Sequence, residues 1–423
     1  MRVLLLTHYF PPEIGSGPHY PMELAESLVK RGHRVTVVTN FPRYNVPVMP
    51  PDYRYRLLKR ECKAGVQILR INAPNFYGSS VVSRGLVQLL APPVLGLRAA
   101  LAGRHDVIYT VTPPIMIGLA ARRVAQVHRV PWVANVQDLF PQCMIDLGIL
   151  RGQRMIRMFE RMERTLYRTA TAITVMSPGN REFVIGRGGD PDRVHVAPNW
   201  VDTDSFDADA PRGEFRREHD LGDAFLVVFA GTMGFSQGLE VVIEAARLTR
   251  SEQGLLWVMV GGGAERDRLA AAADGLSNIR FLPMQPKEKS PRVLADADVC
   301  LVTLRPEVAT PTVPSKIGTI MAAGRPLIAS IPATGDAKRV IEESGGGIVV
   351  PPADAQALAD AVLTMMRDRE TLAEMGRSGR AYAEGHLSRE ACVTLVENVL
   401  KSVTGGAIPS PQRGGLGGGE AAP

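Results

Sequence analysis

The sequence predicts an α/β protein made of two doubly wound domains with parallel sheets. Short apolar runs rich in β-branched residues alternate with segments of helical period, which is the pattern of strand–helix–strand units. The runs are continuously apolar, as expected for strands covered on both faces. The alternation restarts halfway along the 423 residues, and such a length suits two domains of roughly 200 residues each.

Residues 1–203 form the first predicted domain. Its strands are marked by the apolar runs, and its helices by apolar residues that recur with helical spacing. The expected strands are Val3–Leu6, Val35–Thr39, Val107–Val111, Trp132–Val136, Ile173–Val175 and Val194–Val196. The clearest expected helices are Pro21–Arg31, Ile115–His128 and Arg154–Thr169.

Residues 204–403 form the second predicted domain, in which the same alternation begins again. The expected strands are Phe225–Ala230, Leu255–Val260, Ile279–Leu282, Val299–Leu304, Leu327–Ser330 and Ile348–Val350. Helices are expected at Gly238–Thr249, Ala264–Ala273, Ser315–Ala323, Asp336–Glu343, Ala355–Arg367 and Glu370–Ala383. Two such Rossmann-like domains are expected to face a central cleft at the carboxyl ends of their strands, where ligands of these sheets bind.

The stretches outside these elements differ in composition. Asn199–Gly222 is polar and irregular, as a linker between domains is. The tail at residues 404–423 is rich in Gly and Pro and nearly free of large apolar groups, so we expect it to be disordered.

Charge and cysteine content narrow the class of protein. The formal net charge is +6, which favours anionic partners such as nucleotide phosphates or a lipid surface. The cysteines are far apart in the chain, at Cys62, Cys143, Cys300 and Cys392. This spacing is typical of reduced thiols in a cytoplasmic protein and argues against a zinc site or a disulfide framework.

The apolar stretches do not predict a membrane span. The apolar run at the amino terminus is too short for a signal peptide. The most apolar window, Leu86–Leu101, contains Pro92, Pro93 and Arg98 and falls short of the roughly 20 residues that cross a bilayer. Together with Arg84 and Arg104, this window instead suggests peripheral membrane association; the alternative is a helix packed in the first domain's core.

A glycine-containing loop follows the first expected strand. Gly15, Ser16 and Gly17 precede a helix, whose first N–H groups can face an anion. The dinucleotide fingerprint is not present, because Tyr20 stands where its third glycine belongs and the second strand ends in Asn40 rather than an acid. A tight strand-to-helix turn explains the glycines equally well.

The second half carries two more glycine loops, one after each of its first two expected strands. The first runs from Gly231 to Gly234 and continues to Gln237 and Gly238; the second contains Gly261, Gly262 and Gly263. Each can hold phosphate with backbone N–H groups. Since both follow successive strands, they point to the same edge of the sheet.

Lys316 lies in the first turn of an expected helix, just after Pro314 and Ser315, which are good residues for a helix start. A cation there opposes the helix dipole, and the unfavourable placement favours a functional contact with a diphosphate. The alternative is a solvated surface lysine.

Asp138 follows the expected strand Trp132–Val136, on the side where the cleft is expected. Its place favours a role in the site, while a helix-capping role in the loop is the alternative. His8 and His195 also lie near strand ends, but a lone histidine is more often a packed residue than a catalyst.

Taken together, the motifs resemble those of family 4 glycosyltransferases, particularly the polysaccharide-assembly subgroup that includes colanic acid and fucosamine transferases. The resemblance runs from residue 1 to about residue 400 in the family's order. It rests on the segments His8–Glu13, Arg31–Val35, Gln137–Pro141, Pro198–Asp202, Gly231–Gly238, Val313–Lys316 and Met321–Pro326.

This resemblance implies a GT-B fold and a retaining glycosyltransferase without a metal. It implies a UDP- or GDP-sugar donor held mainly by the second domain, and a lipid-linked or glycan acceptor, not a nucleic acid, held mainly by the first. Lys316 would stabilise the leaving diphosphate and Asp138 would orient the acceptor. The implied donor contacts are Gly15, Ser16, Gly17, Gly231, Gln237, Gly261, Gly262, Gly263, Pro314, Ser315 and Thr319. The implied role is synthesis of cell-envelope polysaccharide or glycolipid at the inner face of the cell membrane.

Two departures from the family pattern keep other functions open. Pro311 and Thr319 stand where many members have a pair of glutamates, and Gln237 stands where many have a lysine. The alternatives are an isomerase of the UDP-N-acetylglucosamine 2-epimerase type, or a non-catalytic subunit that binds nucleotide or glycan.

Overall fold

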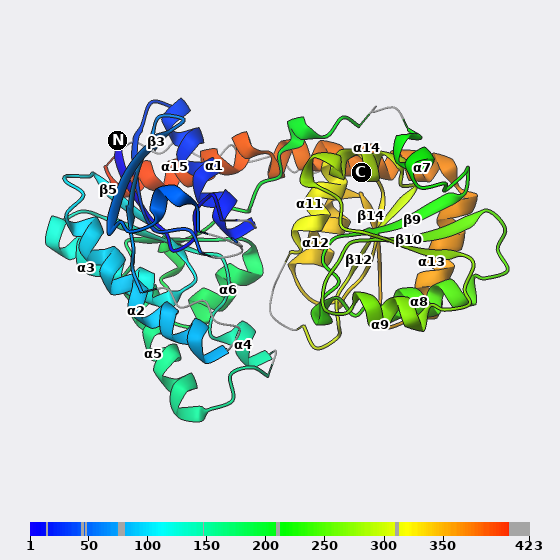
Figure 1. The fold of residues 1–423 in the computed structure, drawn as a ribbon, viewed down its shortest axis with the longest axis horizontal. Coiled ribbons are helices and arrows are strands. Elements are labelled where there is room, and N and C mark those ends of the chain that lie inside the picture. Colours follow the sequence, from blue (N-terminus) through cyan, green and yellow to red (C-terminus); the bar gives the residue numbers. More distant parts are fainter. Residues whose placement is uncertain are drawn as a thin grey trace, which may run out of the picture.

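The structure, a computed structural model, describes residues 1–13, 16–43, 46, 49–74, 81–146, 148–208, 212–308 and 313–405. Within these ranges it contains two domains, each with a mostly or wholly parallel sheet between helices, so the predicted α/β class is confirmed. Figure 1 shows them as two lobes, the first in blue and cyan and the second mainly in green, yellow and orange.

The first sheet has the strand order β3-β4-β2-β1-β5-β6-β7-β8. Its strands are β1 (Arg2–Leu6), β2 (Arg34–Asn40), β3 (Leu58–Lys63), β4 (Val66–Ile71), β5 (Val107–Thr112), β6 (Trp132–Val136), β7 (Ala172–Val175) and β8 (Val194–Val196). Each neighbouring pair is parallel except β3 with β4. The chain moves outward from β1 on one side and then returns to β5 on the other, which places the topological switch point between β1 and β5.

Helices cover both faces of this sheet because alternate strand residues point to opposite sides. Leu4 and Leu6 enter a core with α2 (Val81–Ala100), α3 (Ile115–His128) and α5 (Gln153–Thr169). Val3 and Leu5 enter the other core with α1 (Ser16–Lys30). The shorter elements are α4 (Gln142–Asp146), α6 (Pro178–Gly186), η1 (Pro51–Tyr53), η2 (Pro191–Arg193) and η3 (Thr203–Ser205).

The second sheet is parallel and has the order β11-β10-β9-β12-β13-β14. Its strands are β9 (Phe225–Ala230), β10 (Leu255–Val260), β11 (Ile279–Leu282), β12 (Val299–Thr303), β13 (Leu327–Ser330) and β14 (Gly347–Val350). These are the strands that the sequence predicts, within a residue at each end. The switch point lies between β9 and β12, the central strands.

Helices lie on both faces of the second sheet as well, and two separate core clusters fill the space beneath them. The helices are α7 (Glu214–Glu218), α8 (Glu240–Leu248), α9 (Arg266–Ala272), α10 (Ser290–Asp296), α11 (Ser315–Ala322), α12 (Asp336–Ser344), α13 (Ala355–Arg367) and α14 (Arg369–Tyr382). Shorter turns are η4 (Phe235–Gln237), η5 (Lys287–Lys289) and the π-helix η6 (Ala383–Leu387).

The last helix, α15 (Arg389–Val403), returns to the first domain. Val393, Val396 and Leu400 lie in the core beside α1, and Figure 1 shows α15 in the first lobe. The predicted second domain, residues 204–403, thus includes a last helix that packs with residues 1–203. Of the predicted tail at residues 404–423, Thr404 and Gly405 form a turn after α15, and the rest lies outside the described residues.

The apolar stretch Leu86–Leu101 falls on α2, which packs in the first domain. Val87, Ala91, Leu95 and Ala99 are buried, four residues apart along one side of the helix. Other residues of α2, including Leu90 and Leu97, are exposed. No helix among the described residues is long and apolar enough to cross a membrane.

Candidate functional site

The two glycine loops of the second domain lie against each other. Gly231 follows β9 and Gly261 follows β10, and these strands are paired neighbours. A Cβ added to Gly261 would lie 1.9 Å from the carbonyl oxygen of Gly231, and one added to Gly263 would lie 2.5 Å from that of Met233. The Met233 N–H also donates to the Gly262 carbonyl at 2.8 Å. Glycine is therefore needed at 261 and 263 for the loops to approach this closely.

Lys316 lies over the first of these loops. Its Nζ is 3.7 Å from the centroid of the Phe229 ring and donates to Oε1 of Gln237 at 3.2 Å. A Cβ added to Gly231 would come within 2.6 Å of Lys316 Cε, so the glycine leaves the space that the lysine occupies. The structure thus joins Lys316, Gly231 and Gln237 at the switch point of the second sheet, between β9 and the segment that follows β12.

The ammonium group of Lys316 has no carboxylate partner among the described residues. Burial lowers its pKa to about 7, because a charged amine loses hydration there. A neighbouring anion would raise this pKa again and recover the charged form. The surroundings of Lys316 are therefore electrostatically suited to a phosphate group.

The amino terminus of α11 adds hydrogen-bond donors to the same place. Pro314 occupies the cap position, and no side chain caps the helix. Ser315 and Lys316 form the first turn, where N–H groups have no partner within the helix. Thr319, one turn further, uses its hydroxyl to donate to the Ser315 carbonyl at 3.1 Å, so that hydroxyl also supports the helix itself.

Arg305, which the sequence analysis did not single out, holds the loop that carries Gln237. Its guanidinium lies 3.9 Å from the centroid of the Phe235 ring and donates from Nε to the Phe235 carbonyl at 2.6 Å. It also pairs with Glu240 at 2.7 Å. The residue lies just after β12, far from the loop in sequence, and no local pattern marks this contact.

Asp138 lies in the first domain, two residues beyond β6. Its side chain is exposed at the surface, although the surrounding protein desolvates the carboxyl group enough to raise its pKa above the usual value. It borders a small cavity of about 10 Å³ together with Thr112 and Tyr167. An exposed carboxyl group at a strand end is accessible to a ligand, so its geometry agrees with an acceptor-side role.

The loop after β1 is only partly described. Gly15 lies outside the described residues, and the side chain of Ser16 is not described. Gly17 is exposed in the first turn of α1, with open space around a Cβ. The structure therefore brings Lys316, Gly231, Gln237, Gly261 and Gly263 together but does not place Gly15 or Ser16 with them.

Two buried residues lie near this loop: Arg70, which the sequence did not indicate, and His8, which the sequence indicated as a packed residue rather than a catalyst. Arg70 on β4 donates to the carbonyl oxygens of Pro11 and Asn40 and so ties the β1 loop to the end of β2. It also pairs with Glu61 at 3.0 Å. His8, at the end of β1, is buried, and desolvation lowers its pKa to about 4, which keeps the imidazole neutral near pH 7.

Comparisons with known proteins show the family to which the chain belongs. Residues 17–200 match the glycosyl transferase 4-like domain, and residues 224–368 match the glycosyl transferases group 1 domain. The chain is 27% identical over 400 residues to the putative colanic acid biosynthesis glycosyl transferase WcaI of Escherichia coli K12, covering 92% of this chain and 97% of that protein.

Two further proteins extend the comparison. A GDP-mannose-dependent alpha-(1-6)-phosphatidylinositol monomannoside mannosyltransferase of Mycobacterium tuberculosis is 25% identical, covering 90% of this chain and 93% of the relative. The crystal structure of Anabaena Alr3699/HepE in complex with UDP matches with a TM-score of 0.71 at 18% identity, over 95% of this chain and 100% of that one.

The two Rossmann-like domains and the two matching family models show a glycosyltransferase with the GT-B fold. Within that class, the chain belongs to glycosyltransferase family 4.

Proposed function

We propose that this chain is a retaining glycosyltransferase that moves a sugar from a UDP- or GDP-sugar to a lipid-linked or glycan acceptor in the synthesis of cell-envelope polysaccharide or glycolipid. The observation that carries the proposal is Lys316, a half-buried cation without a carboxylate partner among the described residues, over the first of two adjoining glycine loops. Such a cation needs an anion, and the diphosphate of a nucleotide sugar supplies one.

The donor's diphosphate would lie between Lys316, the start of α11 and the loops at Gly231 and Gly261. Negative charge develops on the diphosphate as the bond to the anomeric carbon breaks. A fixed cation and preorganised N–H groups stabilise that charge more in the transition state than in the ground state. Gln237 would hold the ammonium group in place, since it accepts its hydrogen bond.

The acceptor would approach from the first domain. Asp138 would accept a hydrogen bond from the acceptor hydroxyl and orient it toward the sugar. Gly17, which has no side chain, would allow the backbone of the first domain to come close to the substrates. A raised pKa makes the Asp138 carboxylate a better proton acceptor than an ordinary aspartate.

The substrate classes are supported by proteins that are similar to this chain. WcaI carries colanic acid biosynthesis in its name, and the mycobacterial mannosyltransferase is named for GDP-mannose and a phosphatidylinositol mannoside acceptor. HepE was crystallised with UDP and with UDP-glucose. We propose on this basis that the acceptor is attached to a lipid and that the enzyme acts at a membrane surface.

A thermal-shift screen of the purified chain with UDP- and GDP-sugars tests the donor class. A ligand at one hundred times its dissociation constant stabilises the folded state by about 2.7 kcal/mol, so the true donor stands out by its melting temperature. Stabilisation by one nucleotide class, with transfer of label from that donor to a lipid extract, is the expected result. If no UDP- or GDP-sugar raises the melting temperature, the proposed function is wrong.

A further inference from the structure

Helix α5 of the first domain carries a row of arginines on its outer side. Arg154, Arg157 and Arg161 are exposed and are spaced by three and four residues, so they lie along one side of the helix. The inner side is different: Leu166 and Tyr167 are buried in the core. The helix is therefore anchored by one face and presents cations with the other.

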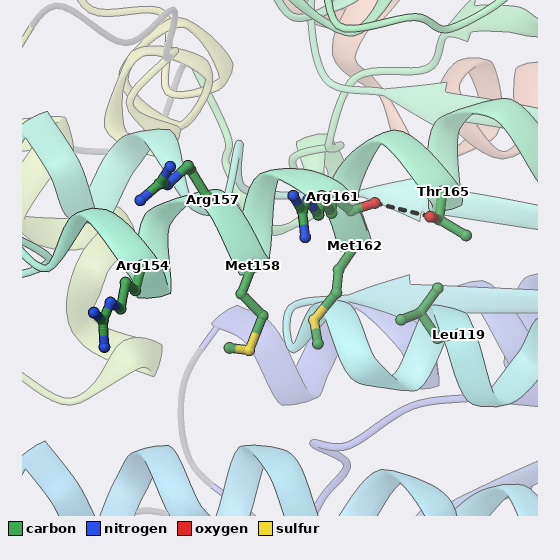
Figure 2. Close-up of a pocket in the computed structure, with 7 residues that line it drawn as sticks. All are labelled: Leu119, Arg154, Arg157, Met158, Arg161, Met162 and Thr165. Carbon is green, nitrogen blue, oxygen red and sulfur yellow. Dashed lines mark hydrogen bonds between the residues drawn. The ribbon is translucent and has the colours of Figure 1, made fainter.

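An open groove lies beside these arginines. It encloses about 420 Å³, and its lining adds Met158, Met162 and Thr165 of α5 and Leu119 of α3 to the three arginines. Figure 2 shows Met158 and Met162 extending from the same side of α5, with Met162 the nearer of the two to Leu119. Apolar and cationic side chains thus line the groove together, which suits an amphiphilic anion.

The three guanidinium groups have no carboxylate partner among the residues that the structure describes. Arg157 donates only to the Gln153 carbonyl within its own helix, at 3.3 Å. Glu160, the acid nearest to them on the helix, pairs instead with Arg187 at 3.1 Å. Three like charges within two helical turns repel one another, and a bound anion would relieve that repulsion.

Large apolar side chains are exposed next to the arginines. Met155 is 50% exposed, Met158 is 38% exposed, and Ile149, just before α5, is 51% exposed. A small soluble anion needs cations but gains nothing from exposed methionines. A membrane surface offers both lipid phosphates for the guanidinium groups and an apolar layer just beneath them.

We propose that this outer face of α5, which we call the α5 face (Met155, Met158, Arg154, Arg157 and Arg161), docks the enzyme on a membrane of anionic lipids. The arginines bind lipid phosphates, and the methionines enter the boundary between headgroups and acyl chains. This inference rests on the proposed use of a lipid-linked acceptor. It moves the expected membrane contact from the Leu86–Leu101 stretch, where Val87, Ala91, Leu95 and Ala99 are buried, to α5.

Flotation of the full chain with vesicles tests this docking surface. The chain should float with phosphatidylglycerol vesicles at low salt and not with phosphatidylcholine vesicles. The variant with Arg154→Gln, Arg157→Gln and Arg161→Gln should bind about 100-fold more weakly, from the contribution of three basic residues near an anionic surface.

The matched control removes three charges from the second domain: Arg250→Gln, Arg367→Gln and Arg377→Gln. These arginines are exposed and have no ion pair among the described residues, so the net charge changes equally. The control should float like the unmodified chain. Equal loss in both triple variants would show a mere net-charge effect and would overturn the proposal, as would failure of the unmodified chain to float.

A second pair of changes, Met155→Ser with Met158→Ser, tests the apolar part. This variant should still float at low salt but should lose binding at high salt, because salt screens the arginines and leaves only the apolar contact. Unchanged binding at high salt would contradict the insertion of the methionines. Melting-temperature shifts with nucleotide sugar, measured on each variant, show separately whether the proposed donor site is intact.

Discussion

Lys316 occupies a position that is unfavourable for a cation, and the proposed contact with a diphosphate would account for it. It lies in the first turn of α11, where the helix dipole disfavours a cation, and burial lowers its pKa to about 7. Its contacts are a ring face and an amide oxygen, neither of which carries a charge. These costs are offset if a diphosphate binds beside it.

Replacing Lys316 should therefore affect catalysis more than binding of the donor sugar. By analogy with the loss of one oxyanion donor, Lys316→Ala should lower kcat by about 100-fold or more, with a smaller change in KM. Lys316→Arg should recover part of the rate, since charge returns in a different shape. Steady-state kinetics, with circular dichroism as a check on folding, measures both.

Lys63→Ala is the matched control, because that lysine is exposed at the end of β3. It should leave kcat unchanged. A folded Lys316→Ala enzyme with near-normal kcat would mean that the diphosphate is stabilised elsewhere.

The pH dependence of nucleotide binding follows from the same residue. In the free enzyme the pKa of Lys316 is about 7, and a bound diphosphate raises it. Binding therefore takes up a proton above pH 7, and affinity for the nucleoside diphosphate should fall as pH rises from 7 toward 9. Titrations across that range check this, and a flat profile in the unmodified enzyme would contradict the assignment.

At the scale of elements, α15 fastens the end of the chain to the first domain through Glu397. That carboxylate pairs with Arg31 at 2.7 Å and Lys401 at 2.6 Å and contacts His33 at 2.9 Å. Partial burial acts to raise its pKa, but the hydrogen bonds from Lys401, His33 and Arg31 outweigh burial and lower the pKa to about 2.

Glu397→Gln should destabilise the first domain by about 2 kcal/mol, after allowance for solvent screening of the pKa shift. Because the folded pKa is lowered, this contribution is complete above the unfolded value and disappears as pH falls through roughly 4 toward 2. Unfolding in urea at pH 7 and at pH 3 measures both effects. Glu374→Gln, an exposed acid on α14, is the control and should be neutral.

The β3–β4 hairpin and α15 are elements that the sequence pattern did not predict. The central strands were predictable because they are continuously apolar. β3 reads Leu-Lys-Arg-Glu-Cys-Lys and is mostly exposed, so nothing in it resembles a buried strand. α15 was not among the predicted helices, and its local sequence does not say which domain it packs against; the structure places Val393, Val396 and Leu400 in the core of the first domain.

The residues of the candidate site also differ in how far their positions could be predicted from the sequence. Gly231, Gly261 and Lys316 could be predicted because each directly follows a strand or begins a helix, and the edge of a parallel sheet brings such positions together. Arg70 and Arg305 could not, because their backbone and side-chain partners lie in other segments of the chain. Such contacts depend on the folded chain and leave no mark in local sequence.

At the scale of the whole molecule, the two domains are joined by more than the linker. α15 crosses back to the first domain, and Asp336 of α12 accepts hydrogen bonds from the Gly179 N–H of α6 at 3.0 and 3.1 Å. The domain that carries the glycine loops is thus held against the domain that carries Asp138. The proposed reaction needs both, since donor and acceptor sides lie on different domains.

Transfer should continue in the presence of EDTA. The expectation rests on the chemistry of the residues: Lys316 and the backbone N–H groups can balance the diphosphate charge, and the described residues contain no group of three His, Cys, Asp or Glu placed to hold a metal. Activity measured with excess EDTA should match the untreated enzyme. Complete loss that Mg²⁺ or Mn²⁺ restores would contradict this.

The most direct measurement is calorimetric titration of UDP and GDP into the unmodified chain and into Lys316→Ala. The proposed donor site predicts that one of the two diphosphates binds and that the variant binds it roughly 10- to 100-fold more weakly, as expected for one lost charge-assisted hydrogen bond. Absence of binding for both diphosphates, or equal affinity in the folded variant, would contradict the assignment of this site.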